Sequence, residues 1–132
     1  MNDKKDTPPT ILMFELDDDT RLLLKQNLYN WGYRVLVAIE EEDAIAMARG
    51  GRDHPDLILL NQVKLPIDEF LDMGRRIREG AELLSSTPIV VMAERYGEDM
   101  EGKDIKVGEN EYVTYLEDGE QLMNLLYRLC PV

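Results

Sequence analysis

The stretch Pro55-Asp56-Leu57-Ile58-Leu59-Leu60-Asn61-Gln62-Val63-Lys64-Leu65-Pro66 decides the fold class. It opens with a turn-forming Pro-Asp pair, continues through four apolar residues, and ends in a polar loop closed by Leu-Pro. Such a short apolar run is typical of a strand that is buried on both faces of a parallel sheet. Because ligands bind at the carboxyl ends of strands in open α/β sheets, Asn61 lies where we expect a reacting or binding group.

The same alternation of apolar runs and helical periodicity continues on both sides of this stretch. We expect strands at 10–16, 33–39, 55–61, 88–92 and 112–116, and helices at 17–31, 40–48, 69–79 and 120–129. Residues 94–107 should hold a fifth helix, although Gly97 and Gly102 weaken it by about 1 kcal/mol each. Five strands and five helices joined by short crossovers predict a single doubly wound α/β domain, with a five-stranded parallel sheet covered on both faces.

Length and charge narrow the class of protein. The 132 residues suffice for about one domain, which we place at residues 10–132 after a loose polar arm at residues 1–9. A net charge of −12 argues against nucleic acid or an anionic membrane as a direct partner, since both attract clustered Lys and Arg. The single cysteine, Cys130, excludes an internal disulfide, and no secretory or membrane-spanning pattern is visible, so we expect a cytoplasmic protein.

Taken together, several motifs resemble a response-regulator receiver domain. They are the strand 56–60 with its Leu65-Pro66, an acidic loop after the first strand, and Gly108-x-x-x-Tyr112-Val113 downstream. The resemblance implies a flavodoxin-like sheet of strand order 2-1-3-4-5, with the first and last helices on one face. In the family an aspartate at the end of the third strand accepts a phosphoryl group from a histidine kinase. The matching residue here is Asn61, or Gln62 if the alignment is counted back from Pro66, and either is an amide.

The acidic loop matches the family's magnesium site only in part. Glu15 stands at the first of the paired acids, Leu16 stands at the second, which is a direct Mg²⁺ ligand in the family, and Asp17 follows. Leu16 and Asn61 together remove both direct side-chain anions that Mg²⁺ prefers. In an ordinary structural role, Glu15 and Asp17 are loop acids that cap the following helix.

The remaining pocket positions also depart from the family. Ala93 stands where the family has a hydroxyl that binds the phosphate, and Tyr115 stands where it has a lysine that neutralises the phosphoryl oxygens. Tyr112 falls on the family's switch aromatic. We therefore expect a degenerate pocket that holds no metal or other cofactor and performs no catalysis.

The leading interpretation is a phosphorylation-independent receiver-like signalling module that acts through a protein partner or through homodimers. One alternative is a two-component phosphoacceptor that uses Asp17 or Asp68, and another is a small-ligand-binding domain that reuses the crevice at the strand ends. If the pocket is silent, an exposed apolar patch on the first and last helices is the candidate interface. Its residues are Leu22, Tyr29, Met123, Tyr127 and Cys130. The alternative for Met123 and Tyr127 is that they widen the core stripe of the last helix.

Overall fold

The computed structural model describes residues 7–50 and 54–132. The predicted N-terminal arm therefore lies outside the described residues for its first six positions. The described elements, in chain order, are β1 (Thr10–Phe14), α1 (Asp18–Asn30), β2 (Arg34–Ala38), α2 (Glu41–Arg49), β3 (Leu57–Asn61), α3 (Ile67–Gly80), β4 (Ile89–Met92), β5 (Asp104–Gly108), β6 (Glu111–Thr114) and α4 (Gly119–Leu129).

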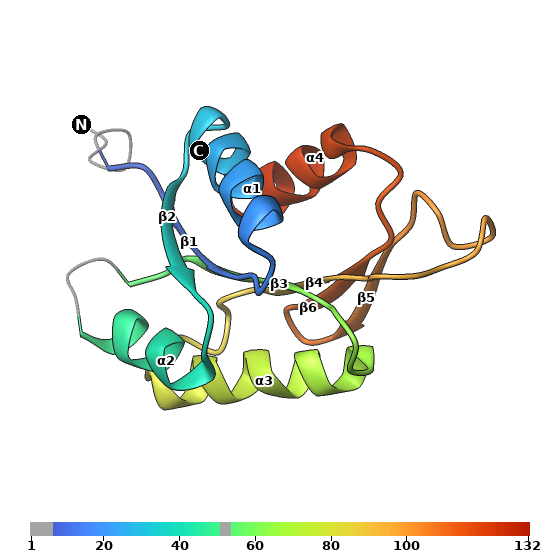
Figure 1. Ribbon diagram of the computed structural model, residues 1–132. Coiled ribbons are helices and arrows are strands. Elements are labelled where there is room, and N and C mark those ends of the chain that lie inside the picture. Colours follow the sequence, from blue (N-terminus) through green and yellow to red (C-terminus); the bar gives the residue numbers. More distant parts are fainter. Residues whose placement is uncertain (1–6, 51–53) are drawn as a thin grey trace.

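The strands form one sheet in the order β2-β1-β3-β4-β6-β5. The first five positions are parallel and reproduce the expected order 2-1-3-4-5, with β6 as the fifth predicted strand. As expected, α1 and α4 cover one face, while α2 and α3 cover the other (Figure 1). No helix in the described part of the chain is long and apolar enough to cross a membrane.

Each face of the sheet has its own apolar core. On the α2/α3 face, Leu12, Ile58, Leu60 and Phe70 are buried together. On the α1/α4 face, a second cluster includes Ile11, Met13, Leu24, Leu28, Leu59, Leu122 and Leu126. All five residues of β1 are buried, as are the four apolar residues of β3, which explains why these strands read as continuous apolar runs rather than alternating ones.

The predicted helix at 94–107 is wrong. The chain there forms a loop with a turn and then β5, which pairs antiparallel with β6 at the edge of the sheet. Gly102 has a φ of 88°, a left-handed conformation that ends any helix passing through it. Ile105 and Val107 alternate with polar residues and are β-branched, so this part of the segment favours a strand. The described chain consequently has four helices and a sixth strand.

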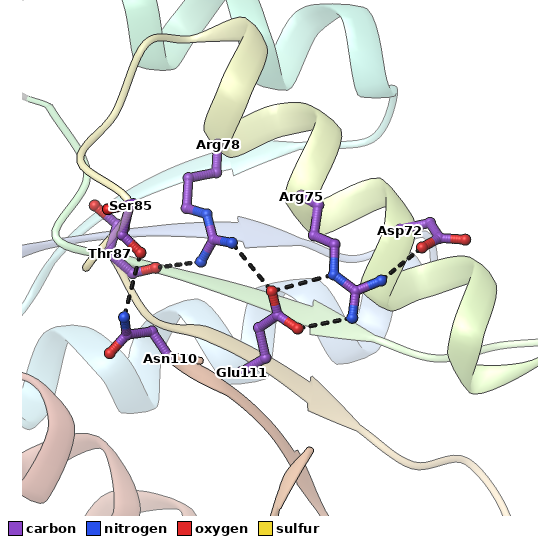
Figure 2. A network of polar contacts seen from close by, with 7 residues as sticks. All are labelled: Asp72, Arg75, Arg78, Ser85, Thr87, Asn110 and Glu111. Carbon is purple, nitrogen blue, oxygen red and sulfur yellow. Dashed lines mark hydrogen bonds and ion pairs between the residues drawn. The ribbon is translucent and has the colours of Figure 1, made fainter. Parts of the chain in front are cut away.

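A partly buried ion-pair cluster joins α3 to β6. The Glu111 carboxylate accepts hydrogen bonds from Arg75 Nε and Nη2 at 3.1 and 2.7 Å, and from Arg78 Nη2 at 3.0 Å (Figure 2). Arg78 also donates to the carbonyl oxygen of Thr87 at 3.1 Å. The guanidinium groups hold the pKa of Glu111 below its usual value, the hydrogen bond from Arg75 being the largest cause. This cluster positions the end of the sheet that carries β6 and β5.

Candidate functional site

The centre of the candidate pocket is a contact between Glu15 and Asn61. Glu15 directly follows β1 and is fully buried, and Asn61 is the last residue of the neighbouring strand β3. Asn61 Nδ2 donates a hydrogen bond of 2.7 Å to Glu15 Oε1. Burial raises the pKa of Glu15, while hydrogen bonds from the Asp17 backbone and from Asn61 oppose that rise. One carboxylate oxygen of Glu15, the buried acid at this strand end, is therefore already hydrogen-bonded to the amide of Asn61.

The other residues of the acidic loop are turned to helix capping or to solvent. Asp17 is the N-cap of α1, and its Oδ2 accepts a 2.8 Å hydrogen bond from the backbone N–H of Thr20. That hydrogen bond is the largest cause of a lowered pKa at Asp17. Leu16 is exposed. The capping role predicted for Asp17 is confirmed, whereas Glu15 does not cap the helix with its side chain but accepts the N–H of Asp17 at 3.2 Å.

The far side of the pocket is apolar and aromatic. Ala93 follows β4, and its N–H donates to the carbonyl oxygen of Thr114 at 3.0 Å. Tyr115 is half-buried on the α2/α3 face of the sheet, and its ring meets that of Tyr96 edge-on at 5.5 Å. Tyr112 is half-buried against the opposite core, beside α4. The side chain of Ala93 carries no hydroxyl group, and that of Tyr115 carries no cation. Within the described residues, neither side chain is hydrogen-bonded to Asn61.

One feature of the pocket was not expected from the sequence, which singled out Gln62 only as an alternative acceptor. The side chain of Gln62 bridges two loops. Its Nε2 donates to the carbonyl oxygen of Leu65 and its Oε1 accepts the N–H of Glu94, both at 2.8 Å. Glu94 adds a second link between the same two loops, because its Oε1 accepts a hydrogen bond from the N–H of Lys64 at 3.0 Å. The loops after β3 and β4 are therefore joined by the chain's own polar groups.

The predicted interface residues do not form one surface. Cys130 is buried, with 6% of its surface exposed, so its assignment to an exposed row is wrong. Tyr127 is half-buried and packs against the core, and Met123 is also half-buried. Leu22 and Tyr29 are exposed as expected, but Leu22 lines a hollow with Val37 of β2, on the flank of α1 away from α4. Tyr29, seven residues later, lies on that same flank.

A groove of about 260 Å³ lies instead between α1 and the start of α4. It begins at Asn61 and runs along the side of α1 that faces α4. Its lining consists of Thr20, Leu23, Leu24, Asn27, Trp31, Asn61, Met92, Ala93, Tyr96, Leu116, Gly119 and Leu122. Sequence reasoning missed Leu23, although its spacing from Thr20, Asn27 and Trp31 places these residues on one helical stripe.

This architecture is similar to that of response-regulator receiver domains. A response regulator from Thermotoga maritima is similar over 95% of this chain and 99% of that chain, with a TM-score of 0.65 and 20% sequence identity. The chemotaxis protein CheY4 of Vibrio cholerae gives a TM-score of 0.65 at 20% identity, covering 93% of this chain and 99% of that one.

A further similar structure bears on the pocket. The receiver domain of the sensor histidine kinase PA1611 from Pseudomonas aeruginosa, solved with a magnesium ion coordinated in its active site cleft, has a TM-score of 0.62 and 21% identity. It covers 93% of this chain and 98% of that chain. No protein-family model and no curated protein matches the sequence. At these identities the likeness establishes the receiver fold, and the function has to be argued from the residues of this chain.

Proposed function

We propose that this protein is a receiver-like signalling module whose phosphoacceptor site is silent and which acts through contacts with another protein. The observation on which this rests is the 2.7 Å hydrogen bond from Asn61 to Glu15. An amide is a neutral, weak nucleophile, and here its N–H group points at the acid that would otherwise bind a metal. The same contact leaves Glu15 with one oxygen toward Asn61 and the other toward the Asp17 N–H.

The charges required for phosphoryl transfer are missing from the positions that would supply them. Leu16 is exposed and carries no ligand atom, and Tyr115 packs against Tyr96 in place of presenting a cation. A transferring phosphoryl group needs both metal and fixed cations to neutralise its developing charge. The magnesium in the cleft of the PA1611 receiver domain marks the chemistry that we propose this chain has lost.

The bridge through Gln62 supports independence from phosphate. In a phosphate-activated receiver, the loop after the fourth strand is drawn toward the phosphate by a hydroxyl. In this chain that loop is already hydrogen-bonded to Gln62 and Lys64 through Glu94. The surface around the strand ends is thus held in one arrangement without a modification, which suits constitutive binding.

The two alternative acids fit the phosphoacceptor role poorly. Asp17 Oδ2 is engaged in capping α1, and its lowered pKa reflects that hydrogen bond. Asp68 is exposed in the first turn of α3, a position that favours an acid through the helix dipole alone.

Incubation with acetyl phosphate and Mg²⁺, followed by intact-mass spectrometry, tests the proposal. We expect no mass increase, and an unchanged result for the paired variant Asp17→Asn/Asp68→Asn. A stoichiometric phosphoryl adduct on the native chain would contradict it. If that adduct disappeared in either single variant, the corresponding acid would be the acceptor.

A further inference from the structure

The groove between α1 and α4 is closed at one end and open at the other. Near the carboxyl ends of the helices, Tyr127 donates through its hydroxyl to the carbonyl oxygen of Trp31 at 2.9 Å. Tyr33 donates similarly to the carbonyl oxygen of Cys130 at 2.7 Å. The groove starts at Asn61 and Ala93, where the helices begin. The hydrogen bond from Tyr127 therefore joins α4 to the end of α1 and closes this end of the groove, while the bond from Tyr33 holds the residue that follows α4.

The walls of the groove are apolar and partly unprotected. Leu23 lines the groove with 61% of its surface exposed, and its side chain is not part of the apolar core that packs on the sheet. Half-buried Trp31, Tyr96 and Leu116 complete the walls, and buried Leu122 and Met92 lie at the floor. A volume of 260 Å³ is below the roughly 300–1,000 Å³ of small-molecule sites. It has room for a few apolar side chains of a larger partner.

The rim of the groove is strongly acidic. Exposed acids stand within three residues of its lining residues on all three segments that form its open end: Asp17, Asp19, Glu94, Glu98, Asp99, Glu117, Asp118 and Glu120. Asp18 is not among them, because it lines the hollow beside Leu22 on the other flank of α1. The exposed cations on these segments are fewer, with Arg95 and Lys103 the nearest to Tyr96 in the chain. Acids also suit helix starts and solubility, but those roles do not explain why Leu23 is left exposed between them.

We propose that this groove docks a cationic amphipathic helix of a partner protein. Its apolar side chains enter between Leu23 and Tyr96, and its Lys and Arg residues face the acids of the rim. Two helices that flank an apolar groove accept a third through interlocking side chains, and such recognition uses anchors at i, i+3, i+4 and i+7. The acidic rim selects a basic helix and repels nucleic acid and anionic membranes. This inference rests on the proposed function, because it names the chemistry of the partner.

The chain offers a reporter and a matched pair of variants for a test. Trp31 is the single tryptophan and lines the groove, so its fluorescence reports occupancy. Leu23→Lys places a charge in the groove, whereas Leu22→Lys places the same charge on the adjacent residue, which is 70% exposed on the other flank of α1. Both variants replace exposed side chains, so neither should disturb the fold.

The probe is a synthetic helical peptide of about 15 residues, with leucines at i, i+4 and i+7 and lysines on its remaining face. We expect saturable binding that shifts Trp31 fluorescence and weakens with salt. Leu23→Lys should weaken it at least tenfold and Leu22→Lys less than twofold. Two control peptides carry glutamate in place of lysine, or serine in place of leucine, and neither should bind.

Several results would overturn the proposal. They are the absence of binding, equal weakening by both variants, or equal binding of the serine peptide, which would reduce the effect to bulk charge. Sedimentation of the protein alone adds one more: a dimer that Leu23→Lys dissociates would make a second copy the occupant. If the peptide does not bind and no phosphoryl adduct forms, the docking proposal is overturned and the proposed silent pocket is retained. An adduct together with peptide binding would overturn only the proposed function.

Discussion

Replacing Glu111 with glutamine should reveal how firmly α3 is fastened to the β6 edge of the sheet. The substitution keeps the shape and one acceptor oxygen but removes the charge that faces Arg75 and Arg78. Arg78 has only 15% of its side chain exposed, so the loss of its charged hydrogen bond should cost about 1.5–3 kcal/mol. Arg75 is 43% exposed and solvent screening limits its share to about 0–1 kcal/mol. Unfolding free energy should therefore fall by about 1.5–4 kcal/mol.

Urea unfolding of Glu111→Gln and the native protein, followed by circular dichroism, measures this loss, and thermal unfolding should show a Tm lower by roughly 5–16 °C. Asp72→Asn is the matched control, because its bond to Arg75 joins two exposed side chains and should contribute under about 1 kcal/mol. A loss no larger than that of the control would refute the reasoning.

The pH dependence gives an independent check of the same network. The folded-state pKa of Glu111 lies below its ordinary value of 4.5, so its contribution is present above pH 4.5 and is lost as pH falls through the lower folded value. The difference in unfolding free energy between the native protein and Glu111→Gln should stay constant from neutral pH down to about pH 5 and shrink below 4.5. A difference that does not change with pH would show that charge is not its source.

Three further predictions concern the candidate pocket and the closed end of the groove. Asn61→Asp should lower the unfolding free energy at neutral pH by about 1–3 kcal/mol, because it sets a second carboxylate against buried Glu15. Urea unfolding should show that this loss shrinks at acid pH, whereas equal stability of both proteins would argue against the contact. Burial raises the pKa of Cys130 to about 11, so at pH 8 the thiol should react with a thiol reagent on the order of 100-fold more slowly than a free cysteine does. The reaction should become fast in urea, whereas rapid labelling of the folded chain would place Cys130 at the surface. Tyr33→Phe should lower the unfolding free energy by about 0.5–1.5 kcal/mol, because the hydrogen bond to the carbonyl oxygen of Cys130 is lost. Tyr29→Phe, at an exposed position, should change the unfolding free energy little, and equal effects of the two variants would show that the hydrogen bond does not stabilise the fold.

The parallel part of the fold followed from the sequence because its central strands β1, β3 and β4 are buried on both faces. The apolar run 57–60 can lie only inside such a sheet, and the stripe formed by Leu24 and Leu28 fixes the inward side of α1. Gly32 ends that helix with a φ of 103°, as its position predicts. Apolar patterns within each segment were therefore sufficient to predict β1 to β4, β6 and all four helices.

The segment 94–107 could not be predicted in the same way. Its element type is decided by pairing with β6, which lies beyond it in the chain, and its own apolar content is low. The sequence was expected to hold a helix there, and the alternation at Ile105 and Val107 becomes decisive only through pairing with β6.

The candidate pocket was located from the sequence, but its contacts were not. Strand ends place Asn61 and Glu15 at one edge, yet the hydrogen bond between them depends on register. The bridge from Gln62 to Glu94 depends on two loop conformations, including a left-handed Lys64 with a φ of 66°. The helical phase of α1 separates exposed Leu22 from groove-lining Leu23, a distinction that an apolar count cannot make.

The proposed silent pocket requires that neither Mg²⁺ nor a phosphoryl group breaks the contact between Asn61 and Glu15. Its most direct test is a titration with Mg²⁺ and beryllofluoride, a phosphoryl mimic, followed by the backbone amide NMR signals of Glu15, Asp17, Asn61 and Ala93. We expect that none of these signals shifts in a saturable manner, and that the Asn61 side-chain amide keeps its hydrogen-bonded position throughout. A saturable shift centred on Glu15 and Asn61 would contradict it.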